Sequence, residues 1–205
     1  MHLTRKNILR TLWCNQEQRI MKPAVFNIKY TLRTEMVDGA TTEDMSLWQN
    51  LSFQTINHFL EEQMFNSIIY DMKGKDMLER YLVEYDNNLV FLPTANEACL
   101  TTSLHAKLNS ICHEHSIVEN IELQDTLDDL SYNYYNDELV YPTLPAMEDW
   151  LGELSFWETP WWFRQDFSTF DNFAFDHDEL DAWKVDVEQQ EVAGLMGLAF
   201  QELQQ

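Results

Sequence analysis

The sequence of 205 residues contains little glycine and little proline, five of each. Both residues interrupt helices and strands, so their scarcity favours long regular elements over a loop-rich architecture. Hydrophobic residues make up 45% of the chain and aromatic residues 13%. That composition is sufficient for a packed core and excludes a chain that is disordered throughout. The length suits one domain, or one domain with an appendage.

Cysteine is also scarce, with three residues that show no paired spacing: Cys14, Cys99 and Cys112. An odd, unpaired set differs from the disulfide framework of small secreted proteins, so we expect a reducing compartment, the cytoplasm. No apolar run approaches the ~18 residues that a transmembrane helix needs. Asn7 and Arg10 interrupt the apolar residues near the start, which argues against a signal peptide.

Basic residues are the third scarcity, because 13 Lys and Arg face 35 Asp and Glu, for a net charge of −22. Residues 1–40 contain seven basic residues and three acids, whereas residues 119–205 contain 21 acids and only Arg164 and Lys184 as basic residues. Binding to phosphate backbones depends on Lys and Arg, so the segment 119–205 is excluded as a direct nucleic-acid binder. Its charge favours either a basic protein partner or solubility alone.

Two patterns near the start predict a strand and then a long helix. Residues 25–37 alternate apolar and polar side chains with period two, which is typical of a half-buried strand with Phe26, Ile28, Tyr30, Leu32, Thr34 and Met36 on its buried face. Asp38-Gly39 then predicts a turn. Thr41 and Asp44 are typical of a helix start, and the apolar residues that follow predict an amphipathic helix ending near Gly74.

The next residues predict a hairpin, a second helix and a further strand. Residues 80–92 fit a hairpin, although residues 76–84 also fit a helical face. Thr94 and Glu97 predict a capping box for a helix over 95–112, whose buried stripe is Leu100, Leu104, Leu108 and Ile111. Ile117, Val118, Ile121 and Leu123 predict the last strand. This order of elements predicts an α+β domain with a ferredoxin-like βαββαβ core.

The same patterns predict three parts of the chain. Residues 1–22 are expected to be a basic N-terminal extension, either a short amphipathic helix or a disordered lead. Residues 23–136 are the expected core domain. Residues 137–205 are expected to form an acidic, aromatic-rich and mainly helical extension packed on that core. Its aromatic residues between 157 and 175 are expected to be largely buried, because so many exposed rings would favour aggregation.

No pattern in the sequence predicts catalysis, a metal site or a cofactor. Cys112-His113-Glu114-His115 is the one cluster of metal-capable side chains, but adjacent residues project in different directions and the spacing matches no zinc motif. A polar helix terminus is the simpler interpretation. Neither GxSxG nor a glycine-rich phosphate loop is present, and 35 acids produce carboxylate pairs by chance. We therefore expect a protein that is not an enzyme, with a carboxylate-based hydrolase as the third-ranked alternative.

The acidic residues near the C-terminus are the candidate partner-binding site. Asp176 to Glu191 contain seven acids in 16 residues. At the ~1.5 Å rise per residue of a helix, this is about one charge per 3.4 Å, the spacing of phosphates along one DNA strand. The predicted partner-binding residues are Asp125, Asp128, Asp129, Asp137, Glu138, Asp176, Asp178, Glu179, Asp181, Trp183, Asp186, Glu188 and Glu191.

Two kinds of binding protein fit this array. The first hypothesis is a DNA-mimic inhibitor of a nucleic-acid-binding or defence enzyme, by analogy with acidic anti-defence proteins of phages. Its partner would be a basic surface such as a DNA-binding groove, with neither nucleic acid nor membrane bound directly. The alternative is a structural or assembly subunit of a larger complex, such as a virion, that docks through its C-terminal helix. A homo-oligomer remains open in either case.

Overall fold

The computed structural model describes residues 2–15, 20–71, 88–127, 130–135 and 160–167 of the chain. These residues form an α+β structure with two α-helices and one mixed six-stranded sheet. The strands are β1 (His2–Asn15), β2 (Ile20–Thr34), β3 (Ser67–Tyr70), β4 (Leu89–Phe91), β5 (Ser116–Asp125) and β6 (Ser131–Tyr135). The helices are α1 (Thr42–His58), which continues into the π-helical turn η1 (Phe59–Gln63), and α3 (Glu97–Ile111).

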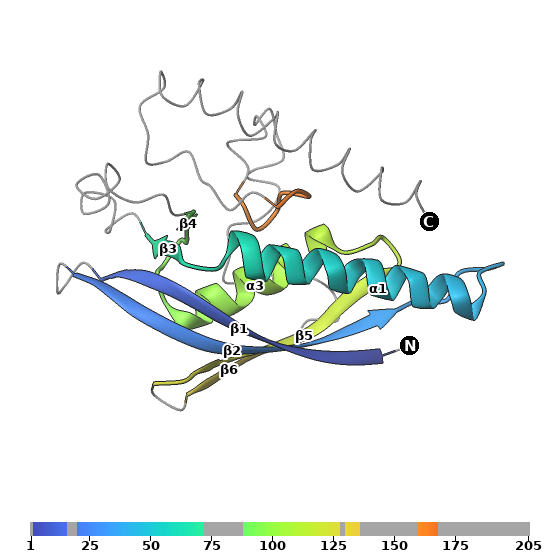
Figure 1. Cartoon of the computed structure of the whole chain (residues 1–205), viewed down its shortest axis with the longest axis horizontal. Coiled ribbons are helices and arrows are strands. Elements are labelled where there is room, and N and C mark those ends of the chain that lie inside the picture. The colour runs from blue at the N-terminus through green and yellow to red at the C-terminus, as the bar shows by residue number, and fades with distance from the viewer. Residues whose placement is uncertain (1, 16–19, 72–87, 128–129, 136–159, 168–205) are drawn as a thin grey trace, which may run out of the picture. The chain divides into compact units, whose positions relative to one another are not determined.

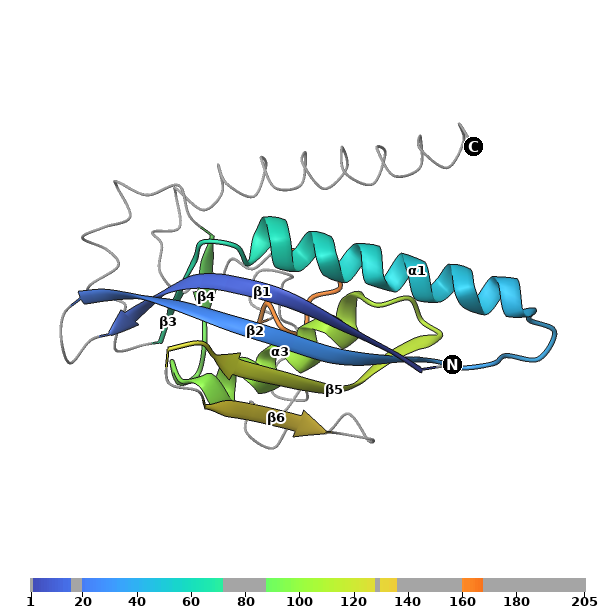
Figure 2. The same ribbon diagram turned by 60° about the horizontal axis from the view of Figure 1, so that its bottom comes forward.

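The order of strands across the sheet is β4-β3-β1-β2-β5-β6. β1, β2, β5 and β6 pair antiparallel with one another, whereas β3 and β4 add to β1 in parallel. Both helices lie on one face of the sheet, and in the described residues no helix covers the other face (Figures 1 and 2). None of the described helices is long and apolar enough to cross a membrane.

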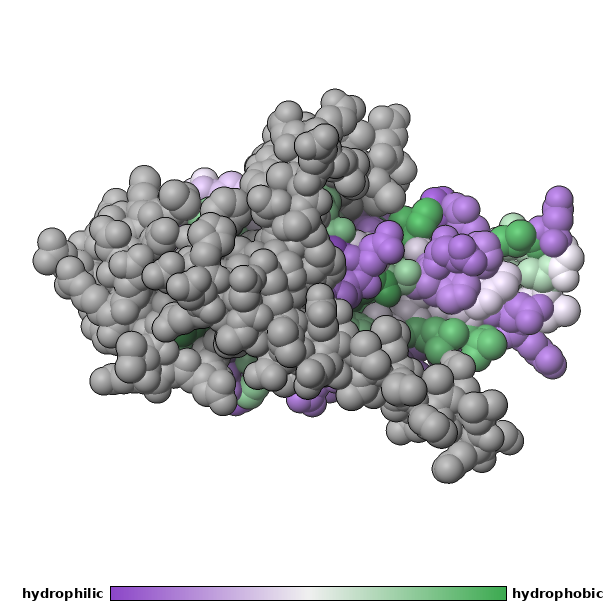
Figure 3. Space-filling model, turned by 90° about the horizontal axis from the view of Figure 1, so that it is seen from above, coloured by the Kyte–Doolittle hydropathy of each residue, from purple (hydrophilic) through white to green (hydrophobic). Residues whose placement is uncertain are grey.

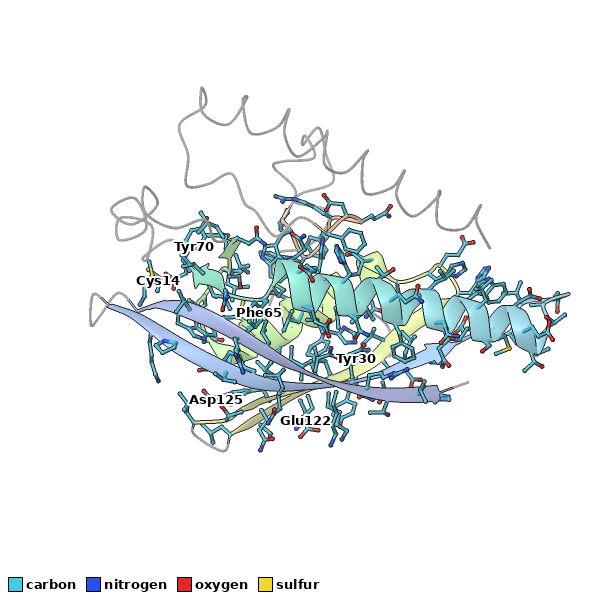
Figure 4. The ribbon with its side chains drawn as sticks, viewed as in Figure 1. Cys14, Tyr30, Phe65, Tyr70, Glu122 and Asp125 are labelled. Atoms are coloured by element: carbon cyan, nitrogen blue, oxygen red, sulfur yellow. The ribbon has the colours of Figure 1, made fainter. Side chains whose placement is uncertain are left out.

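Strand β2 confirms the predicted alternation. Phe26, Ile28, Tyr30 and Leu32 are fully buried beneath the helices. Tyr30 points from the sheet into the helix layer in Figure 4, whereas Glu122 of β5 points away from the helices. The strand begins earlier than predicted and ends at Thr34, so Met36, 74% exposed, lies beyond it.

The prediction of a helix or a disordered lead at the N-terminus was wrong, because His2–Asn15 is strand β1. It pairs with β2 along its whole length, from His2 opposite Arg33 to Asn15 opposite Ile20. Leu9, Thr11 and Trp13 are the residues that face the helices and are buried. The alternation of buried and exposed residues is not evident in the sequence, because Thr11, between Leu9 and Trp13 on the buried side, is polar. The predicted domain boundaries themselves stay predictions.

Helix α1 confirms the predicted turn and helix start, and Thr41 with Asp44 forms a capping box there. Gly39 adopts a φ of 88°, which glycine tolerates at little cost. The Thr41 hydroxyl accepts a hydrogen bond from the Asp44 backbone N–H (3.2 Å), and an Asp44 carboxylate oxygen accepts one from the Thr41 backbone N–H (2.7 Å). These bonds satisfy backbone donors that the first turn of a helix leaves free.

The predicted end of this helix near Gly74 was wrong. The helix ends at His58, η1 follows, and Asn66 adopts a left-handed φ of 57°. Ile68, expected on the helical stripe, lies instead in β3, whose four residues are all buried. Adjacent β-branched residues, Ile68 and Ile69, favour a strand that is covered on both faces.

Helix α3 confirms the predicted leucine stripe but begins two residues later than its predicted cap. The N-cap is Asn96, whose side chain accepts a hydrogen bond from the Cys99 backbone N–H (2.8 Å), so the predicted capping box of Thr94 and Glu97 does not form. Thr101, Thr102, Ser103, His105 and Lys107 are buried in addition to the stripe. The helix is therefore covered on nearly all sides.

The remaining strands agree with the sequence in part. β5 confirms the predicted last strand, and β4 lies within the second half of the predicted hairpin. β4 pairs in parallel with β3, and the first half of the predicted hairpin lies outside the described residues. From β2 to β5 the described elements run strand, helix, strand, strand, helix, strand, which is the predicted order by type. The third of them, β3, lies in residues predicted as helix, whereas the strand predicted before residue 86 is outside the described residues. β1 and β6 are additional.

We expect Thr41→Ala to lower the free energy of unfolding by about 1 kcal/mol, because the helix loses its N-cap acceptor. Thr42→Ala, one residue further on, is the matched control and should change stability by only a few tenths of a kcal/mol. Urea unfolding followed by circular dichroism measures both. Equal effects of the two substitutions would contradict a role for the capping box.

Candidate functional site

Asp125 is the one predicted partner-binding residue within the described part of the chain. It ends β5 and is 5% exposed. Its carboxylate accepts a hydrogen bond from the Leu127 backbone N–H (2.7 Å), and its own N–H donates to the Leu130 carbonyl (2.9 Å). Asp125 thus stabilises the turn into β6, and its carboxylate is committed to that turn. The other predicted residues lie outside the described residues: Asp128, Asp129, Asp137, Glu138, Asp176, Asp178, Glu179, Asp181, Trp183, Asp186, Glu188 and Glu191.

A buried lysine joins the acidic C-terminal part of the chain to the helix layer. Lys107 of α3 is fully buried, and its ammonium group donates to the carbonyls of Arg164 (3.0 Å) and Asp166. The Asp166 carboxylate lies 3.6 Å from the same nitrogen, and the Phe59 ring centroid lies 5.7 Å from it. A buried cation is tolerated only with such acceptors around it. Lys107 therefore fixes the segment 160–167 on α3.

Ser110, one turn further along α3, strengthens this attachment. Its hydroxyl lies 2.7 Å from the Arg164 carbonyl, which Lys107 also binds. The sequence contained a signal for this site that we missed. Between Glu97 and Ile111, Lys107 is the single cation and no other charged residue occurs. A helix with so little charge has no solvated face, so its one lysine needs an internal partner.

Aromatic side chains complete the attachment of the segment 160–167. Trp161 and Trp162 are buried, and the Trp161 indole N–H donates to the Phe91 carbonyl (2.8 Å). The Trp161 ring also stacks with Phe59 at 6.3 Å between centroids, and Phe167 packs edge-on against His58 at 5.1 Å. The predicted burial of the aromatic stretch is confirmed for Trp161 and Trp162, while Phe163 and Phe167 are partly buried. Its other aromatic residues, Trp157, Phe170, Phe173 and Phe175, lie outside the described residues.

The Cys112–His115 cluster forms a contact between α1 and the turn that follows α3. The His113 ring stacks on Trp48 at 5.5 Å, and the His115 ring lies 4.5 Å from the same indole. The His113 backbone N–H donates to the Ser52 hydroxyl (3.1 Å). Within the described ranges, no three His, Cys, Asp or Glu side chains converge as metal ligands would. The interpretation of this cluster as a helix terminus fits the contacts.

The protonation states in the core also favour structural roles. Burial raises the pKa of the Cys112 thiol to about 12 and that of Cys14 to about 11, and it raises the pKa of Cys99 as well. These thiols stay protonated near neutral pH and are poor nucleophiles. Burial, together with the neighbouring His115, lowers the pKa of His113, so its ring stacks on Trp48 in the neutral form.

No protein-family model matches the sequence, and the search of curated proteins found no match. Among solved structures, the chain is similar to the crystal structure of an uncharacterized protein from Wolinella succinogenes, with 12% sequence identity and a TM-score of 0.46. The similarity covers 67% of this chain and 98% of that protein.

We expect Lys107→Met to lower the free energy of unfolding by about 3 kcal/mol, because two carbonyls and a carboxylate lose a buried donor. Lys29→Met is the matched control. Lys29 lies 3.1 Å from Glu122, but its side chain is 47% exposed, so its loss should cost about 1 kcal/mol or less. Urea unfolding measures both variants, and limited proteolysis should cut Lys107→Met faster near residues 160–167. Unchanged proteolysis would contradict the anchoring role.

We expect the stability of the fold to depend on His105 below neutral pH. Its ring is fully buried beside Tyr134, and burial lowers its pKa from 6.5 to about 4. The unfolded chain therefore protonates His105 near pH 6.5, whereas the folded chain does so only near pH 4. Above pH 6.5 the ring is neutral in both states and costs the fold no stability, and the free energy of unfolding falls as the pH drops below that value. Up to about 3 kcal/mol is lost between those two pH values.

Many carboxylates titrate in the same range, so the measured quantity is the stability difference between the wild type and His105→Gln. The wild type should lose more stability than the variant when urea unfolding is compared at pH 7 and about pH 4. Parallel losses in the two proteins would show that His105 does not titrate as expected.

Proposed function

We propose that this protein is an acidic, non-enzymatic binding protein whose C-terminal part contacts a basic protein surface, such as the DNA-binding groove of an enzyme. The observation that carries the proposal is the division of charge. The described residues contain eight Lys and Arg and 13 Asp and Glu, a net charge of −5. The rest of the chain accounts for −17 of the total of −22.

The anchored segment 160–167 gives the core a role in this function. Lys107, Trp161 and Trp162 attach the chain to the core just before its most acidic stretch, residues 176–191. A charged segment that is attached to a stable core loses less freedom on binding than a free peptide does. It would compete with DNA for the groove through charge, with fast and salt-sensitive association. An inhibitor of a nucleic-acid-binding or defence enzyme is the specific form that we propose.

Two further assignments belong to this proposal. We assign the core to a ferredoxin-like variant, supported by the order of elements from β2 to β5 and by two helices on one sheet face. We also place the protein in the cytoplasm. The support is that the three cysteines, Cys14, Cys99 and Cys112, are an odd number without the paired spacing of a secreted disulfide framework.

The test uses the full chain as bait at low salt, followed by challenge with duplex DNA. If the chain mimics DNA, added duplex DNA should elute the captured partner from the bait. In the reverse experiment, adding the chain should displace labelled DNA from the purified partner. The variant with Asp178→Asn, Glu179→Gln, Asp181→Asn and Asp186→Asn should compete at least tenfold more weakly. Its matched control neutralises four exposed core acids through Glu43→Gln, Glu61→Gln, Glu62→Gln and Glu114→Gln. A partner that DNA cannot displace, or equal weakening by both variants, would reject the proposal.

A further inference from the structure

The sheet face opposite the helices has the reverse charge of the rest of the molecule. From His2 to Arg10 of β1 the even-numbered residues lie on this face, and from Val25 to Arg33 of β2 the odd-numbered residues do. Their neighbours Leu9, Thr11 and Trp13 of β1 and the even-numbered residues from Ala24 to Thr34 of β2 are buried under the helices. No helix covers this face in the described residues (Figures 2 and 4). We call it the open sheet face.

Basic side chains outnumber acidic ones on the open sheet face. Lys6, Arg10, Lys29 and Arg33 lie there with Glu119, Glu122 and Glu35, the last of which pairs with Arg33, for a net charge of +1. The other described residues together carry −6, so the core has a basic side and an acidic side. In a chain with a net charge of −22, a basic face of this kind indicates a specific anionic partner.

Among the described residues, the ion pairs on this face leave two cations without a carboxylate. Lys29 pairs with Glu122 at 3.1 Å, and Arg33 lies 3.1 Å from Glu35 and 3.4 Å from Glu119. Lys6 and Arg10 are exposed, and no described acid lies within ion-pair distance of either. Lys6 is also directly opposite Lys29 across the two strands, an arrangement that like charges destabilise. A carboxylate supplied by a partner would relieve that repulsion.

The shape of the face favours a polypeptide over nucleic acid. Proteins that bind single strands combine a basic groove with several aromatic rings on which the bases stack. Of the described residues, Tyr135, 71% exposed at the edge strand β6, is the exposed ring on this side of the sheet. On one side of the Lys6–Lys29 pair the Thr4 and Thr31 hydroxyls lie 3.1 Å apart, and on the other side the exposed Ile8 lies opposite Asn27. The open sheet face thus offers carboxylate side chains both cations and hydroxyl donors.

The apolar residues elsewhere on the surface do not form a comparable site. Met36 and Leu47 are exposed, but hydrophilic and hydrophobic side chains are interspersed over the coloured end of the helix side in Figure 3. Scattered exposed apolar residues are normal for a folded protein. The open sheet face is therefore the stronger candidate for an interaction surface.

We propose that the open sheet face binds the acidic C-terminal part of a second copy of this chain. The chain itself supplies the complementary group, because residues 119–205 carry 21 acids against two basic residues. The anchored segment 160–167 lies on the helix side of the core, opposite the open sheet face (Figure 1). In the sequence, the acidic stretch 176–191 follows this segment, so a neighbouring copy can supply it to the open sheet face. Such contacts are head-to-tail and join copies into rings or chains.

This self-association rests on the same C-terminal acids as the proposed function, but it also needs the open sheet face. A substitution on the open sheet face therefore tests the self-association without affecting the proposed function. Sedimentation velocity of the full chain should show association that grows with protein concentration at low salt and disappears near 1 M salt, where the Debye length is about 3 Å. Lys6→Glu should weaken the association constant about tenfold. The matched control is Lys22→Glu, because Lys22 is exposed but lies opposite Trp13, on the helix-covered side of the sheet.

A mixing experiment tests the head-to-tail geometry. Lys6→Glu retains the acids, and the variant neutralised at Asp178, Glu179, Asp181 and Asp186 retains the basic face. Each alone should stay monomeric, whereas an equal mixture should form a one-to-one dimer at low salt. A monomeric wild type, equal effects of Lys6→Glu and Lys22→Glu, or no dimer in the mixture would overturn the proposal. Binding of labelled single-stranded DNA that Lys6→Glu abolishes would assign the face to nucleic acid instead.

Discussion

The buried ammonium group of Lys107 is the interaction on which the arrangement of the described residues depends. A lysine with no exposed surface carries a large desolvation penalty, and Arg164 and Asp166 supply acceptors for its ammonium group. The helix layer can therefore reach its final packing only when that segment is in place. Two parts of the chain more than fifty residues apart become one structural unit through Lys107, with Ser110 and Trp161 adding further contacts.

The position of α3 follows from the same constraint. It lies between the sheet and the segment 160–167, and most of its surface is covered, so its polar residues need partners within the protein. Thr101 and Thr102 donate to carbonyls one turn earlier, and Asn109 bonds to both the N–H and the carbonyl of Val118. These contacts let a helix with few charges occupy the middle of the core, and they align it with the start of β5.

The sequence predicted the elements whose periodicity is strong and whose burial is one-sided. β2 alternates without interruption, and Thr41 with Asp44 forms the helix start that the spacing implied. Predictions failed where two patterns overlap. Ile68 fits a helical stripe as well as a strand, and Thr94 and Asn96 are both good caps, so local chemistry could not choose between them. β1 and Lys107 depend on contacts with distant residues, which periodicity does not contain. The acidic partner-binding residues, Asp125 included, remain predictions.

Strand β1 has a further consequence for the behaviour of the protein at high concentration. β3 pairs with it only at Thr11–Trp13, so in the described part of the chain no strand lies along its outer edge from His2 to Leu9. An exposed edge of this length is a template for edge-to-edge aggregation. Arg5 and Lys6 place positive charge on that edge, and two such edges would repel each other. The charge that makes the face attractive to acids thus also protects the sheet from growing by uncontrolled strand addition.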